Sequence, residues 1–425
     1  MGSEYILKNA RVIDPARGID AVGDIGVADG VVVEASEVKN PAVIDLTGLV
    51  LSPGFIDLHV HLRQPGNNMA ETIASGTMAA AAGGFTSVVA MPNTNPPADT
   101  PGAIELLRST AAHKGVVRVL PCGCMTRGGE GREMASIGSL KAAGVVALSD
   151  DGKCIQDHAL MRHVVEYAKS FELPILDHCE DNYLAANGVM HEGKWSVLLG
   201  FNGISGAAEE LMIARNIILS RMTGWKIHMQ HVSVKESVEL LRNARKAGIR
   251  VTGEATPHHL TLTDECIKKF DTNYKMNPPL RSEEDRQALL DAVAEGVISV
   301  IATDHAPHTL TAKMVEFDNA PFGIIGLETA LCLCYTELVA SGRMSLYALV
   351  ERLTTGPASV LGMDGYGLAV GSPADITVFD PERHFRIDRE KFKSNSRNTP
   401  FDGRETQCQV AMTMVGGEIV YAREN

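Results

Sequence analysis

Histidine and aspartate residues recur at the ends of short apolar runs in this sequence. His59 and His61 close the run at 54–62, and residues two apart on a strand direct their side chains to the same face. The polar residues at the ends of the later runs are Asn93, Asp151, His178, His231 and Asp304. Imidazole and carboxylate groups suit zinc, which lowers the pKa of a bound water to about 7 when one coordination position stays open. The pattern predicts a metal-dependent hydrolase with one or two zinc ions, although manganese, cobalt or iron fit the same ligands.

Some neighbouring residues are open to more than one interpretation. Asp304 follows the apolar run VISVIAT, where an ionised carboxylate is costly unless it is paired; the alternative is a helix cap before APHT. His258 and His259 could belong to a cluster that supports the metal ligands or could simply form a turn, so we leave them unassigned. We expect the remaining histidines of helical or peripheral segments to be surface or packing residues: His113, His158, His163, His191 and His384.

Eight apolar, β-branched runs alternate with Ala- and Leu-rich helical stretches, which is typical of parallel βα units. Eight such units predict a (β/α)8 barrel of the TIM type, whose active site lies at the carboxyl ends of the strands. An open nucleotide-binding sheet is disfavoured, because GYGLAVG at 365–371 has the wrong glycine spacing and no helix after it. The predicted strands are 54–62, 86–92, 116–124, 144–151, 173–180, 226–233, 250–260 and 297–305.

The two ends of the chain have a sequence pattern that differs from that of the middle. Short strands separated by Gly, Asp and Pro fill residues 5–51, and similar segments return in GSPADITVFD and QVAMTMVGGEIVYA. We expect the termini to join into one small, β-sandwich-like domain. The predicted domains are therefore 1–52 with 365–425 for the small β domain, and 53–364 for the barrel, giving an α/β protein.

Composition excludes several functional classes. The formal charge of −13 and the absence of a basic stripe argue against nucleic-acid binding, which needs clustered Lys and Arg. No apolar run approaches the roughly 18 residues of a membrane span, and no secretory leader is visible, so we expect a cytoplasmic protein without a membrane partner. The eight cysteines lack C-x-x-C pairs, which predicts free thiols that are buried or partly buried.

The chain is similar to a known family over essentially its whole length. GFIDLHVHLR at 54–63 and SPADITVFD near the C-terminus resemble the amidohydrolase superfamily, whose members join a metal-bearing barrel to a small β domain. Within it, the sequence resembles the class I dihydroorotases. The motifs that carry this resemblance, in chain order, are HLRQPG, MPNTNPP, SDDG, DHCED, MNPPLR, TDHAPH and APFGIIGLET.

The resemblance implies a role for each matching residue. His59, His61 and Asp304 would hold one zinc, and His178 and His231 a second, with Asp151 bridging. Many relatives bridge the metals with a carbamylated lysine, but SDDG offers aspartates, so Asp150 and nearby Lys153 stay open as alternatives to Asp151. The implied substrate contacts are His61, Arg63, Asn93, Asn277, His308 and the main chain of Phe322 and Gly323.

The implied reaction is the reversible interconversion of dihydroorotate and N-carbamoyl-aspartate in pyrimidine synthesis. A hydroxide between the two metals would attack the ring amide, and Asp304 would act as general acid and base. Allantoinase and dihydropyrimidinase are alternative activities, and a non-catalytic scaffold for aspartate carbamoyltransferase is a third. The resemblance also allows for a homodimer and for a complex with aspartate carbamoyltransferase.

Overall fold

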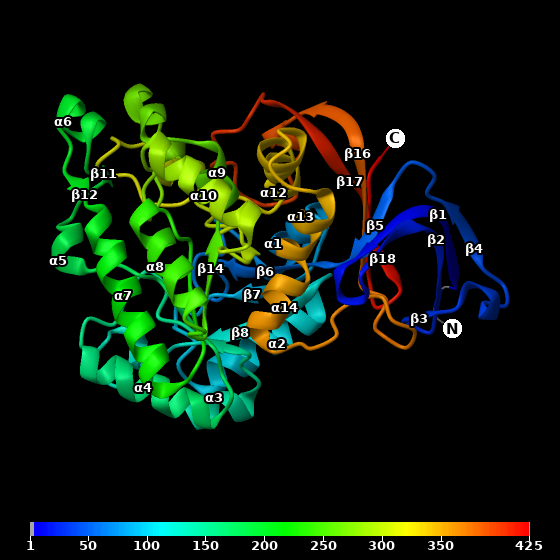
Figure 1. Ribbon diagram of the computed structural model, residues 1–425, viewed down its shortest axis with the longest axis horizontal. Helices are drawn as coiled ribbons and strands as arrows, with labels where there is room; N and C mark the ends of the chain where they lie inside the picture. Colours follow the sequence, from blue (N-terminus) through cyan, green and yellow to red (C-terminus); the bar gives the residue numbers. More distant parts are fainter. Residues whose placement is uncertain (1–3, 425) are drawn as a thin grey trace.

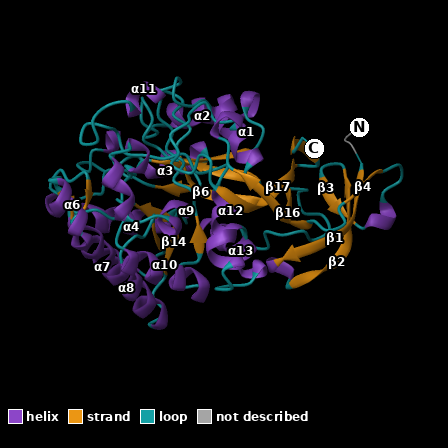
Figure 2. Cartoon of the chain, turned by 90° about the horizontal axis from the view of Figure 1, so that it is seen from above, coloured by secondary structure: helices purple, strands orange, loops and turns teal. Residues whose placement is uncertain are grey.

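A parallel barrel and a mixed sheet beside it make up the molecule (Figure 1). The computed structural model describes residues 4–424, so residues 1–3 and 425 of the predicted small domain lie outside the described residues. The predicted fold class is confirmed. In the view from above, the barrel strands lie among purple helices, whereas the sheet at the other end of the molecule has few helices around it (Figure 2).

The barrel strands follow one another in chain order, each parallel to the next. The ring closes because the segment after the last strand meets the first: Val60 pairs in parallel with His305, and His61 N–H donates to the His305 carbonyl at 2.9 Å. All strand ends that carry the predicted ligands therefore face one opening. The strands are β6 (Phe55–Val60), β7 (Phe85–Ala90), β8 (Arg118–Gly123), β9 (Ala147–Leu148), β10 (Ile175–Asp177), β13 (Ile227–Met229), β14 (Val251–Ala255) and β15 (Val300–Ile301).

Every barrel strand is shorter than its predicted run. The chain bends away where the polar side chains begin, and Arg63, His231 and Asp304 adopt positive φ angles of 57°, 34° and 46°. L-residues rarely adopt this region, and such residues gather at functional sites. The seventh run ends early for another reason, because Pro257 starts the short helix α9 (Pro257–Thr261) at the point where the strand was predicted to continue.

The helices around the barrel explain why its first two strands are buried on both faces. β6 and β7 are buried along their whole length, because one face packs inside the barrel and the other under helices. Local signals fix the helix starts: Thr72 and Ser282 form capping boxes, and Pro101 occupies the first turn of its helix. The main helices are α1 (Ile73–Ala82), α2 (Pro101–Lys114), α3 (Ile137–Ala143), α4 (His158–Ser170), α7 (Gly206–Thr223), α8 (Lys235–Lys246), α10 (Glu283–Glu295), α12 (Ala330–Cys334), α13 (Leu346–Leu353) and α14 (Thr355–Leu361).

Strands from both ends of the chain form the second sheet, in the order β18-β17-β16-β5-β1-β2-β3 with β4 paired to β1. β5 runs parallel to β1 and antiparallel to β16, so it joins the two halves. Leu7, Leu51, Ile376 and Met414 pack in the core of this sheet. Its strands are β1 (Tyr5–Asp14), β2 (Ile19–Ala28), β3 (Val31–Val33), β4 (Ala42–Asp45), β5 (Val50–Pro53), β16 (Ile376–Arg386), β17 (Glu405–Val415) and β18 (Glu418–Ala422).

Two predictions from composition can be compared with the structure. All eight cysteines are free, and seven are buried while Cys266 is partly exposed, as predicted. Within residues 4–424, none of the helices combines the length and the apolar character that a bilayer crossing requires.

Candidate metal centre and substrate pocket

Four histidines and two aspartates from five different strand ends converge at the barrel opening. His59 Nε2 lies 3.2 Å from Asp151 Oδ1 and 3.5 Å from Asp304 Oδ1. His61 Nε2 lies 3.3 Å from Asp151 Oδ2 and 3.1 Å from Asp304 Oδ1. The other pair, His178 Nδ1 and His231 Nε2, are 2.8 Å apart. The structure therefore brings together all six residues predicted as metal ligands.

The donor set fits metal ions. Its ligand atoms form three overlapping groups, each within 4.8 Å, and Asp151 belongs to two of them: His59 with His61, and His178 with His231. His59 Nε2 is buried without a hydrogen-bond partner in the described structure, as expected of a nitrogen that serves as a ligand. Burial and the neighbouring His178 and His59 lower the pKa of His231 well below its usual value, so this imidazole is neutral, the form that binds metals.

Asp151, rather than Asp150, faces this cluster. Burial opposes its ionisation, but His59, His61 and His178 outweigh that effect and hold the pKa of Asp151 well below the usual range. The Asp150 carboxylate instead accepts the Met125 N–H at 2.8 Å and the Thr126 N–H at 3.1 Å on the far side. Lys153 is exposed at the surface and has no place in the cluster.

Glu254, on β14, supports the cluster from inside the barrel. Its Oε1 lies 2.8 Å from His59 Nδ1, and its Oε2 lies 3.0 Å from His228 Nε2. Burial works against ionisation of Glu254, but the bonds to His228 and His59 prevail and lower its pKa to about 2. An ionised carboxylate can only accept, so His59 donates from Nδ1 to Glu254, and Nε2, which faces the aspartates, is the atom that would bind a metal.

Arg63 and Asn93 lie beside the cluster and differ in how many of their hydrogen-bonding groups are already used. The Arg63 guanidinium is largely buried, which lowers its pKa, yet its one hydrogen bond within residues 4–424 goes from Nε to the Pro307 carbonyl at 3.2 Å. Its outer nitrogens are thus free to bind an anion. The Asn93 amide is already engaged with two ligand residues, because Oδ1 lies 3.0 Å from His61 Nδ1 and Nδ2 donates to Asp151 Oδ2 at 3.1 Å.

The remaining predicted pocket residues come from two loops. Asn277 Oδ1 is buried and lacks a hydrogen-bond partner in the part of the chain described. His308 Nε2–H donates to the Phe322 carbonyl at 2.7 Å, and burial together with the charge of Arg63 lowers the pKa of His308 to about 3. Gly323 has a φ of 139°, and a Cβ there would lie 2.8 Å from the Ala306 carbonyl oxygen, so only glycine fits.

The histidines outside the ligand set also have definite positions. His259 packs against the neighbouring loop, with Nδ1 2.7 Å from Thr256 Oγ1 and Nε2 3.0 Å from the Pro278 carbonyl. His258 is buried next to it, and its Nε2 has no partner within residues 4–424. Of the five predicted peripheral histidines, His191 pairs with Asp264 at 2.8 Å and the other four are exposed, which confirms that prediction.

Sequence reasoning missed Glu254, and one signal was available. The strand V-T-G-E-A places a carboxylate among residues that are otherwise apolar or small, where an unpaired charge is costly. That cost predicts a partner but does not say which one. The partners His59 and His228 lie on other strands, and only the barrel register places them next to Glu254.

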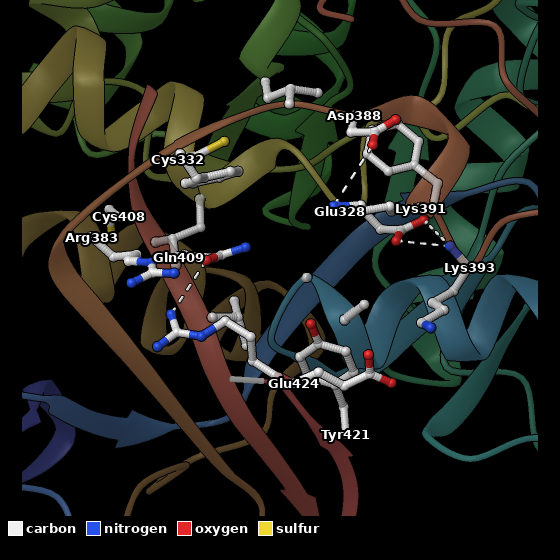
Figure 3. Close-up of a pocket in the computed structure, with 18 of the residues that line it drawn as sticks. Glu328, Cys332, Arg383, Asp388, Lys391, Lys393, Cys408, Gln409, Tyr421 and Glu424 are labelled. Carbon is white, nitrogen blue, oxygen red and sulfur yellow. Dashed lines mark hydrogen bonds and ion pairs between the residues drawn. The ribbon is translucent and has the colours of Figure 1, made fainter. Parts of the chain in front are cut away.

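A cavity of about 1170 Å³ lies outside the barrel and away from the metal cluster (Figure 3). It is lined by residues of β16, β17 and β18, of helices α1 and α12, and of the segment that follows β16. Its lining mixes opposite charges, including Glu328, Arg383, Lys391 and Glu424, and none of the six clustered ligands faces it. We therefore place the chemistry at the barrel opening, where the ligands converge.

Comparison with known proteins agrees with this geometry. The amidohydrolase family model matches residues 50–420. A dihydroorotase of Thermoanaerobacter sp. (strain X514) is 47% identical over 422 residues, covering 99% of this chain and 97% of the relative. A dihydroorotase of Solibacter usitatus (strain Ellin6076) is 46% identical over 423 residues, covering 99% and 98%.

Two solved structures share the fold of this chain. The L-hydantoinase (dihydropyrimidinase) from Arthrobacter aurescens superposes with a TM-score of 0.89 at 27% identity, covering 100% of this chain and 97% of that one. A dihydropyrimidinase from Brevibacillus agri NCHU1002 gives 0.86 at 25%, covering 99% and 95%. From the family match and the identities along the whole chain, we conclude that this protein belongs to the amidohydrolase family.

Proposed function

We propose that this protein is a dihydroorotase, which opens the ring of dihydroorotate to N-carbamoyl-aspartate and closes it again. One observation carries the proposal: a buried arginine that has no carboxylate partner among the described residues, Arg63, lies beside a cluster of six side chains suited to metal binding. The identity of 47% to a dihydroorotase along nearly the whole chain supports the same substrate. The ring amide would then lie at the cluster and the substrate carboxylate at Arg63.

Two zinc ions per subunit fit the cluster best. His59, His61 and Asp304 would hold one, and His178 and His231 the other, with Asp151 shared, in keeping with its place in two ligand groups. When bound, such ions polarise a carbonyl and supply a nucleophile near neutral pH. The role of the chain is to fix the ligand set, with Glu254 and Asn93 holding the outer nitrogens of His59 and His61.

Asp304 is the residue we assign to proton transfer. Its Oδ1 is 3.1 Å from His61 Nε2, at the centre of the cluster and near the barrel opening. During hydrolysis it would take a proton from the attacking water and deliver it to the ring nitrogen as the amide bond breaks. In ring closure the same carboxylate would move the proton in the opposite direction.

Two groups in the pocket lack a partner within the described residues, the outer nitrogens of Arg63 and the Oδ1 of Asn277, and they are the first candidates for substrate contacts. The planar guanidinium of Arg63 suits a carboxylate, which it can bind through two parallel hydrogen bonds. The buried Asn277 Oδ1 can only accept a hydrogen bond, so its partner in the substrate must be a donor such as a ring N–H. His308 and the main chain of Phe322 and Gly323 would complete the pocket, together with His61 and Asn93.

Dihydropyrimidinase is the second candidate, because the two solved structures above are of proteins named for that activity. Its substrates lack the carboxylate that Arg63 would bind. Turnover of dihydroorotate, dihydrouracil and allantoin by the purified zinc protein separates the candidates. We expect dihydroorotate to be used by a large margin. Preferential turnover of dihydrouracil would refute the proposal, and no turnover of any substrate would favour the scaffold role.

The protein partners of this chain remain predictions. A homodimer and a complex with aspartate carbamoyltransferase can be tested by light scattering of the protein alone and after mixing with that enzyme. For the domains, we propose a boundary near residues 53 and 364, as the sequence predicts. Limited proteolysis checks this boundary, because it should cut between the barrel and the small sheet.

A further inference from the structure

Residues 393–399, which we call the crossing segment, leave the small sheet between β16 and β17 and lie against the barrel opening. Its polar side chains alternate in burial. Ser394, Ser396 and Asn398 are 2%, 3% and 4% exposed, whereas Asn395 between them is exposed. Burying three polar side chains is costly unless each is hydrogen-bonded. The alternation therefore raises the question of what these side chains hold.

The two serines fix the segment to the barrel. Ser394 Oγ–H donates to the Glu71 carboxylate, whose Oε2 also lies 3.2 Å from His305 Nε2. Ser396 Oγ–H donates to the Ala70 carbonyl at 2.7 Å. These contacts join the crossing segment to the region before helix α1 and to the residue that follows Asp304, so the segment has a defined place at the opening.

Asn398 contacts the substrate pocket itself through its carboxamide. Its Nδ2 donates to the carbonyls of Ala306 at 3.1 Å and Gly323 at 3.2 Å, and its Oδ1 accepts the His308 N–H at 3.1 Å. The backbone carbonyl of Asn398 accepts the Ile325 N–H at 3.1 Å as well. One side chain thus joins two stretches, 306–308 and 322–325, that are not adjacent in sequence.

The spacing between these two stretches is tight. A Cβ on Gly323 would lie 2.9 Å from His308 Nε2 and 2.8 Å from the Ala306 oxygen, so the two stretches approach too closely for any side chain at this position, and the bond of 2.7 Å from His308 to the Phe322 carbonyl depends on this close approach. Only a carboxamide can donate to two carbonyls and accept an N–H from the same side chain. Aspartate has the same shape but cannot donate, and alanine does neither.

We propose that Asn398 is a positioning residue that sets the spacing of the pocket stretches carrying His308, Phe322 and Gly323. This inference rests on the proposed function for the identity of the substrate. Asn398 touches neither the six ligands nor, in this assignment, the substrate, and it acts through the main chain that it holds. Its loss should therefore weaken substrate binding more than it slows the chemistry.

Asn398→Asp and Asn398→Ala test the proposal in the zinc-loaded full-length protein. Asn395→Asp is the matched control, because it introduces the same change on the exposed side of the same segment. In both Asn398 variants we expect KM for dihydroorotate to rise about tenfold or more, while kcat falls less and zinc content stays at the wild-type value. Asn395→Asp should match the wild type in all three quantities.

Hydrogen exchange adds a readout that does not depend on activity. In Asn398→Ala, the His308 amide loses its acceptor, so peptides covering 306–308 and 322–325 should exchange faster than in the wild type, while those covering β6 stay protected. If the aspartate variant does not fold because its charge is buried, the alanine variant alone decides.

The outcomes separate the two proposals. If the wild type does not open dihydroorotate, the proposed function fails, and the exchange measurement still tests the positioning role. If the wild type is active but Asn398→Ala keeps its KM and its exchange pattern, the positioning role is wrong. Loss of zinc or of the folded state in Asn398→Ala would also overturn it, because the residue would then serve general stability.

Discussion

Replacing Glu254 by Gln should weaken zinc binding without unfolding the barrel. The substitution keeps the shape of the side chain and removes its charge. The Gln oxygen can still accept the His59 Nδ1–H, because in the wild type Nδ1 lies 2.8 Å from Glu254 Oε1. The Gln nitrogen can donate to His228 Nε2, provided His228 carries its proton on Nδ1, where Thr252 Oγ1 lies 2.8 Å away and can accept it. Every buried polar group therefore keeps a partner.

The expected magnitude follows from what the charge does. An anionic acceptor makes the His59 imidazole a better ligand, and removing such a partner typically costs 10- to 100-fold in metal affinity, or about 1.4–2.7 kcal/mol. Glu254 holds the imidazole of His59, whereas it contacts the second site only through the main-chain N–H of His231 at 3.2 Å, so the loss should fall mainly on the site that includes His59. Glu254→Ala should lose more, because it leaves His59 and His228 without an acceptor in a buried place.

Competition between the stripped protein and a fluorescent zinc indicator measures both affinities. Asp14→Asn is the control, since Asp14 is a buried carboxylate in the small sheet, where it accepts the Leu368 N–H at 2.9 Å. It should lose some stability and no zinc affinity. Wild-type zinc affinity in Glu254→Gln, or equal weakening of both sites together with a lower melting temperature, would refute the reasoning.

Four further predictions test the site and its surroundings. Arg63→Ala should lower kcat/KM for dihydroorotate, by an amount that corresponds to about 2–5 kcal/mol of lost transition-state binding, and should leave kcat/KM for dihydrouracil unchanged. Equal losses on both substrates would show that Arg63 has a structural role. Asp304→Asn should slow ring opening and closure together, by about 10²- to 10⁴-fold, while one metal is retained; near-normal cyclisation of N-carbamoyl-aspartate would remove Asp304 from its role. After chelation, zinc in carbonate-free buffer should restore activity, Asp151→Ala should reduce tight metal binding and Lys153→Ala should change the metal content little; a requirement for bicarbonate would contradict an aspartate bridge. Burial raises the pKa of Glu328 to about 7, so above its unfolded pKa near 4.5 the folded state holds a proton that the unfolded state has lost, and this group makes stability fall as pH rises from about 4.5 to 7. Urea unfolding of Glu328→Gln across that range should show a weaker decrease than the wild type, and parallel curves would contradict the assignment.

The strand ends and the ligands could be predicted because their signals are local. His59 and His61 share a face by spacing alone, and Asp304 follows an apolar run that makes an unpaired charge costly. The barrel then explains why such residues meet, since parallel strands place their carboxyl ends at one opening. Residue type and position in the run were sufficient for this part of the site.

The supporting contacts could not be predicted, because they depend on pairs far apart in the chain. Asn398 lies 92 residues from Ala306, and Ser394 lies 323 residues from Glu71. In the sequence, S-N-S-R-N has the composition of an exposed loop, and nothing local shows that alternate side chains are buried. The exact ends of the strands were missed for a similar reason, because the positive φ angles of Arg63 and His231 depend on the surrounding site.

The mixed sheet has a consequence for how the chain folds during synthesis. Pro53 on β5 pairs with Ile376 on β16, and the barrel lies between these two strands in sequence. The ribosome therefore synthesises the whole barrel after β5 and before its partner β16. At about 5–20 residues per second, β5 waits on the order of tens of seconds with one edge unpaired. An open edge can pair with another nascent chain, so during this interval β5 is a site at which two unfinished chains can associate.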